Sequence, residues 1–223
     1  MFLLVVLVYG KTYAIKYFVN NLNKGLYKSV YLCLSTVTVM DFYRSLCIGL
    51  GIIPSHRKID MFNQIQETIK TLVKDRKITP VILLDEVQYM RTEILNDLKM
   101  LLNFDMDSKE MTILILVGQP TVNDTLSRNT HESLKQRVVV NYTFAGLDFI
   151  EVSSYLKDRI HLAGLNENII EENALKALAA NCNGATRKLN SLIEKCLLIC
   201  EQKNESVITA EIVMLAENDM NFI

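Results

Sequence analysis

Two adjacent carboxylates, Asp85 and Glu86, follow a run of four apolar residues from Val81 to Leu84. A short apolar run of this kind predicts a strand buried on both faces, as in a parallel sheet covered by helices. Ligands of open α/β sheets bind beyond the carboxyl ends of the strands, so the spacing predicts that both carboxylates lie at a ligand-binding edge. Taken alone, the same residues fit a core strand followed by a solvated acidic turn equally well.

Three further groups of polar residues stand at the ends of expected elements. Gly10, Lys11 and Thr12 lie between an apolar run and a helical pattern, and by themselves they favour a helix N-terminus with a solvated lysine. Gln119 follows the apolar run TILILV, which predicts another buried strand. Arg187 falls in the first turn of an expected helix, where a cation opposes the helix dipole, and this favours a functional reason for its position.

Strands and helices alternate through the first part of the chain. The expected strands are residues 3–8, 29–34, 81–84, 112–117 and 138–142, and the expected helices are residues 13–22, 39–50, 60–74, 91–102 and a short one that ends at 134–137. This alternation predicts a parallel sheet with right-handed crossovers. In the first helix we expect Ala14, Tyr17, Phe18 and Leu22 to form the buried face.

After residue 142 the strand pattern stops. Helical patterns follow at residues 148–162, 171–180, 187–202 and 209–218, and Thr209 is a favourable N-cap residue. The sequence therefore predicts an α/β domain over residues 1–145 and a small all-helical domain over residues 146–223.

Composition restricts the setting more than the activity. Half of the 223 residues are apolar, and the net charge of −1 gives no hint of a nucleic-acid partner. The five cysteines form no CxxC pair and the histidines are far from them, so we expect a reducing, cytoplasmic setting without zinc, with Cys196 and Cys200 as a core stripe. The apolar run from Phe2 to Tyr9 is too short to span a bilayer and lacks the features of a signal peptide, so we interpret it as a strand and expect no membrane partner.

Taken in order, the motifs resemble those of the AAA+ ATPases, which carry an α/β core followed by a helical lid. GKT at 10–12 resembles the end of a Walker A loop, and LLDE at 83–86 resembles a Walker B strand. Gln119 stands at the sensor 1 position, LKQRV at 134–138 resembles an arginine-bearing element, and NGATRKLN at 183–190 resembles the sensor 2 motif. The resemblance covers nearly the whole chain and is strongest to the compact, ExeA-like proteins of bacterial transposable elements, which are similar to the TniB and MuB type of transposition helper ATPase.

This resemblance implies a P-loop NTPase fold of the AAA+ type. The three-layer αβα parallel sheet would occupy residues 1–145, and the helical lid would follow at 146–223. The resemblance also implies binding of ATP and Mg²⁺. The cofactor-binding residues would be Gly10, Lys11, Thr12 and Asp85, of which Thr12 and Asp85 would hold the metal.

The resemblance likewise implies four catalytic residues. Glu86 would act as the base, Gln119 would orient the attacking water, and Arg187 would reach the γ-phosphate from the lid. Arg137 would be a finger supplied to the neighbouring subunit, with Arg128 as the alternative. Either of these two arginines also fits a surface ion pair.

The resemblance to Walker A is incomplete. A P-loop reads GxxxxGK followed by Ser or Thr, and its glycines let backbone N–H groups surround the phosphates. Counting back from Lys11, the other loop glycines would fall at Val5 and Val8, and both valines resist the positive φ that such loops use. Either the chain begins late or MFLLVVLVY replaces the usual start, and we expect a truncated or rearranged 5′ end of the gene.

The functional expectation is ATP hydrolysis coupled to DNA binding and to recruitment or activation of an element-encoded transposase, in a homo-oligomeric ring or filament. Basic residues at 70–77 and at 187–188 are candidate DNA contacts, but a run of charge is usually a solvated face. One alternative is a nucleotide-binding-deficient remnant that acts as an interaction module. Another is an ExeA-like secretion ATPase, for which we expect a membrane segment and a peptidoglycan-binding region that this sequence does not show.

Overall fold

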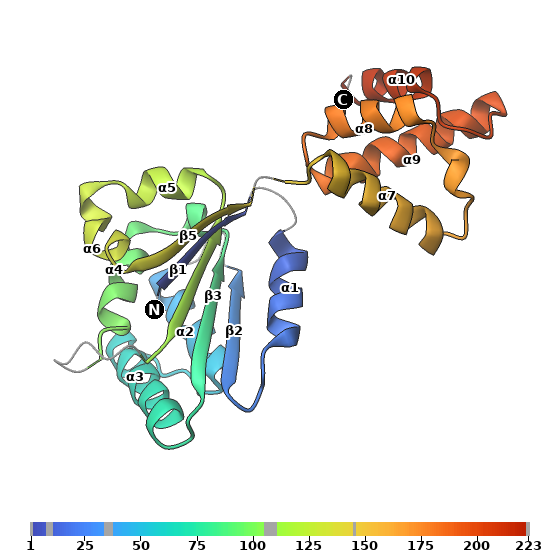
Figure 1. The fold of residues 1–223 in the computed structure, drawn as a ribbon. Helices are drawn as coiled ribbons and strands as arrows, with labels where there is room; N and C mark the ends of the chain where they lie inside the picture. Colours follow the sequence, from blue (N-terminus) through green and yellow to red (C-terminus); the bar gives the residue numbers. More distant parts are fainter. Residues whose placement is uncertain (1, 8–10, 34–37, 105–110, 145, 222–223) are drawn as a thin grey trace. The chain divides into compact units, whose positions relative to one another are not determined.

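The computed structural model describes residues 2–7, 11–33, 38–104, 111–144 and 146–221. The chain forms two compact units, Met1–Phe144 and Ala145–Ile223 (Figure 1). The first unit combines strands and helices and the second is helical, and each is described by itself.

Parallel strands form the sheet of the first unit in the order β2-β3-β4-β1-β5, which confirms the predicted parallel sheet. Their bounds are Phe2–Leu7 (β1), Tyr27–Cys33 (β2), Thr79–Asp85 (β3), Ile113–Gly118 (β4) and Val138–Phe144 (β5). The connection that leaves β1 runs to β2 at one edge, whereas the connection that leaves the adjacent β4 runs to β5 at the other edge. Such a reversal places the ligand-binding crevice of an open α/β sheet beyond the carboxyl ends of those two strands.

Side chains along β3 alternate between two hydrophobic clusters on opposite faces of the sheet. Ile82 and Leu84 belong to the larger cluster, and Val81 and Leu83 belong to the smaller one. All four side chains are at most 1 % exposed. Burial on both faces explains why β3 has an unbroken apolar sequence instead of an alternating one.

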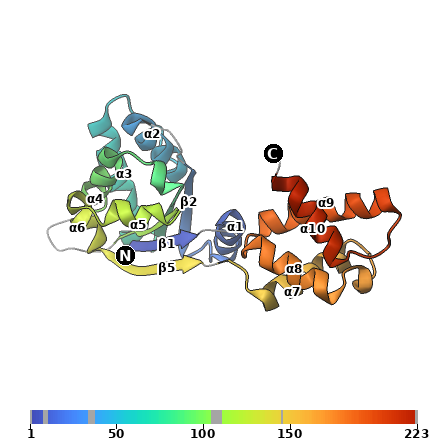
Figure 2. The same ribbon diagram turned by 90° about the horizontal axis from the view of Figure 1, so that it is seen from above.

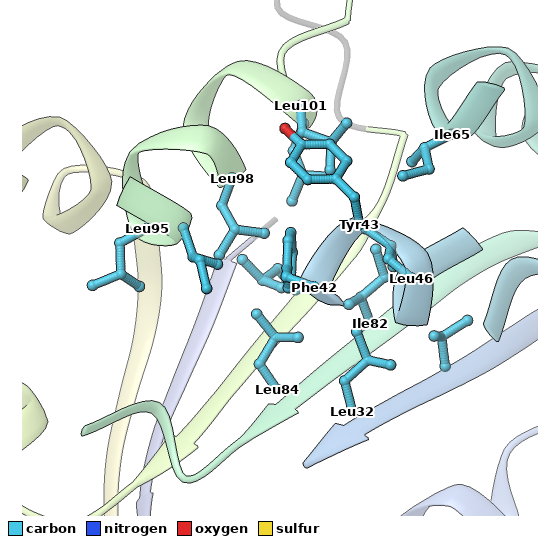
Figure 3. Close-up of a cluster of buried hydrophobic side chains, with 14 of the residues drawn as sticks. Leu32, Phe42, Tyr43, Leu46, Ile65, Ile82, Leu84, Leu95, Leu98 and Leu101 are labelled. Atoms are coloured by element: carbon cyan, nitrogen blue, oxygen red, sulfur yellow. The ribbon is translucent and has the colours of Figure 1, made fainter. Parts of the chain in front are cut away.

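Helices α2 to α6 pack against the face of the sheet that carries the larger cluster (Figures 1 and 3). Their bounds are Val39–Leu50 (α2), Lys58–Lys74 (α3), Thr92–Leu101 (α4), Thr121–Leu126 (α5) and Glu132–Lys135 (α6), with 3-10 turns at Val87–Tyr89 (η1) and Asn129–His131 (η2). The rings of Phe42 and Tyr43 lie at the centre of this cluster, 5.6 Å apart and edge to face. A capping box between Thr38 and Asp41 begins α2, so local sequence sets where this core helix starts.

Helix α1 (Lys11–Asn21) lies on the opposite side of the sheet from α2 to α6 (Figure 2). Ile15, which is 7 % exposed, packs together with Val19 and Leu22 against the smaller cluster. The backbone of α1 therefore runs along the face to which Val81 and Leu83 point.

The predicted buried face of α1 was wrong for all but one of its residues. Leu22 does contact the smaller cluster, but Ala14, Tyr17 and Phe18 are exposed. The helix carries two apolar stripes with helical spacing, and contact with the sheet selects the aliphatic stripe that contains Ile15.

The described part of the second unit is built from helices around one hydrophobic cluster. Their bounds are Phe149–Leu162 (α7), Glu172–Cys182 (α8), Thr186–Lys203 (α9) and Ala210–Asn221 (α10), with a 3-10 turn at Glu167–Ile169 (η3). The Thr209 hydroxyl accepts a hydrogen bond from the Ile212 amide at the start of α10, as predicted (3.4 Å). Cys196 and Cys200 lie inside the cluster, which confirms the predicted core stripe.

The predicted architecture is confirmed as a parallel sheet with helices on both faces, followed by a helical part. Within the ranges that the structure describes, no helix combines the length and apolar character needed to cross a bilayer.

Candidate functional site

Asp85 ends β3 on the face of the sheet that α1 covers. This placement follows from the alternation along the strand, because Val81 and Leu83 already belong to the cluster on that face. The Asp85 side chain is 4 % exposed. Its Oδ2 accepts a hydrogen bond from the Tyr31 hydroxyl and its Oδ1 accepts one from the Glu86 amide, both at 2.8 Å. The two donors compensate the burial of the carboxylate and fix its direction.

The phenol of Tyr31 reaches Asp85 from the neighbouring strand β2. The parallel register pairs Tyr31 with Leu83 and Cys33 with Asp85, so these side chains share one face of the sheet. Burial, and then the hydrogen bond to Asp85 and the charge of its carboxylate, raise the pKa of Tyr31. The phenol therefore stays protonated at neutral pH and remains a donor to Asp85.

Glu86 adopts a left-handed backbone conformation, with a φ of 55°. Residues other than glycine rarely adopt this region, and such strain concentrates at functional sites. The Tyr89 amide donates to the Glu86 carbonyl and the Met90 amide donates to the Val87 carbonyl, both at 3.0 Å, so the following turn is fixed. The half-buried carboxylate of Glu86 accepts a hydrogen bond from Nε2 of Gln88.

Gln119 follows directly after β4, and its side chain is exposed. Its backbone N–H donates to Oε1 of the same Gln88, at 3.1 Å. One side-chain amide therefore links the ends of β3 and β4. The structure brings Asp85, Glu86 and Gln119 together at the carboxyl edge of the sheet.

Lys11 and Thr12 supply the first two residues of α1, the helix on the Asp85 side of the sheet. They follow β1, the strand next to β4. Gly10 lies outside the described residues. Val5, the position expected for the first loop glycine, lies within β1 and pairs with both neighbouring strands. The backbone at Val5 is therefore a strand and not part of a phosphate-binding loop.

Arg137 lies at the amino ends of the strands, whereas Asp85 lies at their carboxyl ends. It directly precedes β5, and Val138 at the start of β5 pairs with Phe2 at the start of β1. Its Nη1 donates to the Lys99 carbonyl of α4, at 3.4 Å. A strand as long as β3 separates the two edges by about 20 Å, so Arg137 is out of reach of the Asp85 of its own chain.

Arg187 is the second residue of α9, in the second unit, and its side chain is exposed. The turn before it contains Asn183 and Gly184 with φ values of 49° and 74°. A Cβ on Gly184 would lie 2.8 Å from the Leu147 amide nitrogen and 2.9 Å from its carbonyl oxygen. Only glycine permits that approach, so this turn fixes where α9 begins and where Arg187 leaves it.

The carboxyl ends of the strands near Asp85 are suited to a Mg²⁺ ion that is bound by both the protein and phosphate groups. Mg²⁺ prefers oxygen ligands and usually binds through one or two carboxylates together with substrate phosphates and water. Asp85 fits this role as a buried, oriented carboxylate. The described residues contain no group of three or more His, Cys, Asp or Glu side chains that would hold a metal by themselves. Oxygens of a bound phosphate compound and of water would supply further ligands for an ion at Asp85.

Tyr31 and Gln88 are the residues of this edge that sequence reasoning missed. Gln88 is visible in the run DEVQY, but a sequence does not reveal the left-handed turn that returns its amide to Glu86. Tyr31 follows only from the strand order, because β2 borders β3 although α2 and α3 lie between them in the chain.

Comparison with known proteins places these features in a family. The AAA domain family matches residues 9–126, which is more than half of the chain. General secretion pathway protein A of Aeromonas hydrophila is 27 % identical over 143 residues, which cover 64 % of this chain and 26 % of that protein. This chain therefore spans about a quarter of the length of that relative.

Solved structures show the same fold. Cdc6p from Pyrobaculum aerophilum has a TM-score of 0.69 at 17 % identity, over 98 % of this chain and 61 % of that one. The ORC2 protein of Aeropyrum pernix, solved in ADPNP–ADP complexes, has a TM-score of 0.67 at 14 % identity, over 96 % of this chain and 61 % of that one. These likenesses confirm the predicted AAA+ fold. Because the match to the AAA domain family extends over more than half of its residues, this chain belongs to that family.

Proposed function

We propose that this chain binds ATP together with Mg²⁺ and hydrolyses it. The observation that carries the proposal is the position of Asp85 and Glu86 at the carboxyl edge of the sheet, on the side where Lys11 and Thr12 begin α1. In P-loop NTPases a lysine and a hydroxyl at a helix start and an acidic strand end hold the phosphates and the metal between them. The solved ADPNP–ADP complexes of ORC2, which has this fold, support the same ligand class.

The roles at the bound nucleotide follow from this placement. Lys11 would pair with the phosphates, Thr12 and Asp85 would hold the metal, and Gly10, from the same GKT motif, would also bind the nucleotide. The bound ion would neutralise charge on the phosphates. Asp85 is already directed by the hydrogen bonds from Tyr31 and Glu86, so it needs little reorganisation to receive an ion.

Three side chains act on the water and on the transferred phosphate. Glu86 takes the proton of the attacking water, and Gln119 orients that water. Arg187 contacts the γ-phosphate from the helical unit. Arg137 acts on the site of a neighbouring subunit, because it lies at the far edge of its own sheet, and Arg128 is the alternative finger.

The proposal extends to DNA and a transposase. ATP turnover would be coupled to DNA binding and to recruitment or activation of the transposase of a mobile element, by a cytoplasmic homo-oligomer. The support is the set of motifs that, taken together, resembles the transposition helper ATPases. The likeness to Cdc6p and ORC2 concerns the fold.

Two other functions have a specific observation in their favour. The 27 % sequence identity to general secretion pathway protein A favours an ATPase of a secretion system. The strand at Val5 favours a remnant that no longer binds nucleotide and acts as an interaction module.

The test is equilibrium binding of Mg²⁺-ATP followed by steady-state turnover. Lys11→Ala weakens binding, whereas Lys16→Ala, on the exposed surface of the same helix, does not. Glu86→Gln keeps the affinity for ATP close to that of the wild type but lowers kcat by about 10²- to 10⁴-fold, because an amide cannot take the proton of water. Duplex DNA at low salt raises the wild-type turnover if the two are coupled.

Each part of the proposal fails separately. A wild-type chain that does not bind ATP is a remnant. Unchanged turnover in Glu86→Gln removes that residue as the base. If duplex DNA does not change the turnover rate, the chain is an ATPase that is not coupled to DNA. That result favours the secretion function.

A further inference from the structure

We propose that Gln88 is a positioning residue that couples the orientation of the Glu86 carboxylate to the segment that begins at Gln119. The inference rests on the proposed function, in which Glu86 is the base and Gln119 orients the water. The proposal is based on two hydrogen bonds of the Gln88 side chain. Its amide donates to the Glu86 carboxylate and accepts from the backbone amide of Gln119.

The chemistry of this bridge requires a side-chain amide. The ionised carboxylate of Glu86 only accepts hydrogen bonds, and the backbone N–H of Gln119 only donates them. Gln88 satisfies both because its Nε2 donates and its Oε1 accepts, and the two partners leave only one orientation of the amide. A glutamate at position 88 could accept the hydrogen bond from the Gln119 amide but could not donate one to Glu86. An apolar residue could form neither hydrogen bond.

The turn after β3 sets the distance that the Gln88 side chain bridges. The left-handed backbone of Glu86 reverses the chain, so that the residue two positions later faces the Glu86 carboxylate. Val87 between them is 2 % exposed and belongs to the larger cluster, which fixes the turn to the core. Gln88 therefore projects from a fixed backbone.

Gly118 provides the space that the Gln88 amide occupies. A Cβ at position 118 would lie 2.9 Å from Gln88 Oε1 and 2.4 Å from Val122 Cγ2. The glycine at the end of β4 is thus explained by close approach. Val122 is 2 % exposed, and its amide donates to the Gln119 carbonyl at 2.9 Å, so the segment on this side of the bridge is also fixed.

Gln88 therefore connects two rigid elements that present the two groups acting on water. The Gln88 amide thereby holds the Glu86 carboxylate in a set orientation relative to the segment that begins at Gln119. Without the amide, the carboxylate loses a hydrogen bond that orients it, and the fraction of molecules with the base in place falls. A misplacement of about 1 Å lowers rate by about 100-fold, so we expect loss of the bridge to lower kcat by about 10- to 100-fold.

Two variants separate the two halves of the bridge, and a third is their control. Gln88→Met keeps the length of the side chain and removes both hydrogen bonds. Gln88→Glu keeps the acceptor for the Gln119 amide but sets a carboxylate against Glu86. Gln202→Met, on the exposed surface of α9, is the matched control for the substitution itself.

The measurements are kcat, the affinity for Mg²⁺-ATP and the backbone amide signal of Gln119 in a nitrogen–proton NMR spectrum. We expect both Gln88 variants to lose kcat with little change in affinity, and Gln202→Met to match the wild type. The Gln119 amide signal moves upfield in Gln88→Met, where its acceptor is lost, and stays hydrogen-bonded in Gln88→Glu. Glu86→Ala shifts that signal when Gln88 is present and leaves it in place in the Gln88→Met background.

A kcat within twofold of the wild type in both Gln88 variants overturns the positioning role. A Gln119 signal that does not respond to Gln88→Met, or that responds to Glu86→Ala equally in both backgrounds, overturns the coupling. If the wild-type chain does not turn over ATP, both the proposed function and the catalytic role of Gln88 are wrong. The amide signals then still decide whether the bridge couples the two segments.

Discussion

The side chain of Asp85 is only 4 % exposed, yet it carries a carboxylate. Burial of a charged group is costly unless its oxygens accept hydrogen bonds, and two donors from separate elements supply them here. Tyr31 is held by the register of β2 against β3, and the Glu86 amide is held by the turn that follows. The same contacts that make the burial tolerable also point Asp85 towards the α1 side of the sheet before any ligand binds.

His131 is a second buried polar residue of the first unit, and its titration gives a prediction. It is 1 % exposed, and its Nδ1 has no hydrogen-bond partner within the described ranges. Burial, and then the positive charges of Lys99 and Arg128, lower the pKa of His131 from its ordinary value of 6.5. Below about pH 6.5 the unfolded chain takes up a proton that the folded chain resists, so acid lowers the free energy of unfolding by at most about 1.4 kcal/mol per pH unit through this residue.

Urea unfolding at pH 7.5 and pH 5.5 measures this effect. We expect His131→Leu to lose less stability between the two pH values than the wild type does. His161→Gln, on the exposed surface of α7, is the control and should keep the wild-type difference. Equal losses in the wild type and in His131→Leu would show that His131 titrates alike in the folded and unfolded chain.

At the scale of elements, α1 shows how a helix with two apolar stripes is oriented. Tyr17 and Phe18 follow one stripe, and Ile15 and Val19 follow the other, rotated by roughly a third of a turn. Helical spacing alone fits either stripe. The sheet beneath α1 presents close-packed aliphatic side chains such as Leu83 and Val117, and the aliphatic stripe packs against them.

Truncation of one residue from each stripe tests this orientation. Ile15→Ala should lower the free energy of unfolding by about 2–4 kcal/mol, because it removes buried aliphatic contacts and leaves a cavity. Tyr17→Ala should change it by no more than about 0.5 kcal/mol, because the Tyr17 side chain is 65 % exposed. Urea unfolding followed by circular dichroism measures both. A larger effect at Tyr17 than at Ile15 would mean that the other stripe is buried.

For the molecule as a whole, the two edges of the sheet have different roles in the proposed function. Asp85 and Glu86 lie at the carboxyl edge, whereas Arg137 precedes β5 at the amino edge. An arginine about 20 Å along the strands from its own acidic pair cannot serve that pair. It can serve the acidic pair of a neighbouring copy, and a catalytic site shared in this way makes turnover depend on assembly.

Mixing two inactive proteins tests the shared site. Arg137→Ala and Glu86→Gln should each have strongly reduced turnover alone, because an arginine finger contributes about 10³- to 10⁵-fold to such reactions. In mixed assemblies, an intact Glu86 on one copy meets an intact Arg137 on its neighbour, so turnover should recover in part. Steady-state assays over a range of mixing ratios measure the recovery. Turnover that stays at the sum of the two separate rates at every ratio would assign Arg137 to a structural role.

The sequence by itself determined the features that depend on neighbours a few residues away. The unbroken apolar run at 81–84 predicted a strand buried on both faces, and the carboxylates that follow were expected at the edge where they lie. Thr209 marked the start of α10 because an N-cap hydroxyl acts on an amide three residues later. The change from alternating strands and helices to helices alone predicted the helical part after the sheet.

Only the tertiary structure decided which groups from distant segments meet. The strand order places Tyr31 beside Asp85, and the sheet selects the buried face of α1. The left-handed turn at Glu86 brings the Gln88 amide between the ends of β3 and β4. These contacts depend on crossovers and on packing against a partner surface. Residue spacing does not encode them, because the same local pattern is compatible with more than one partner.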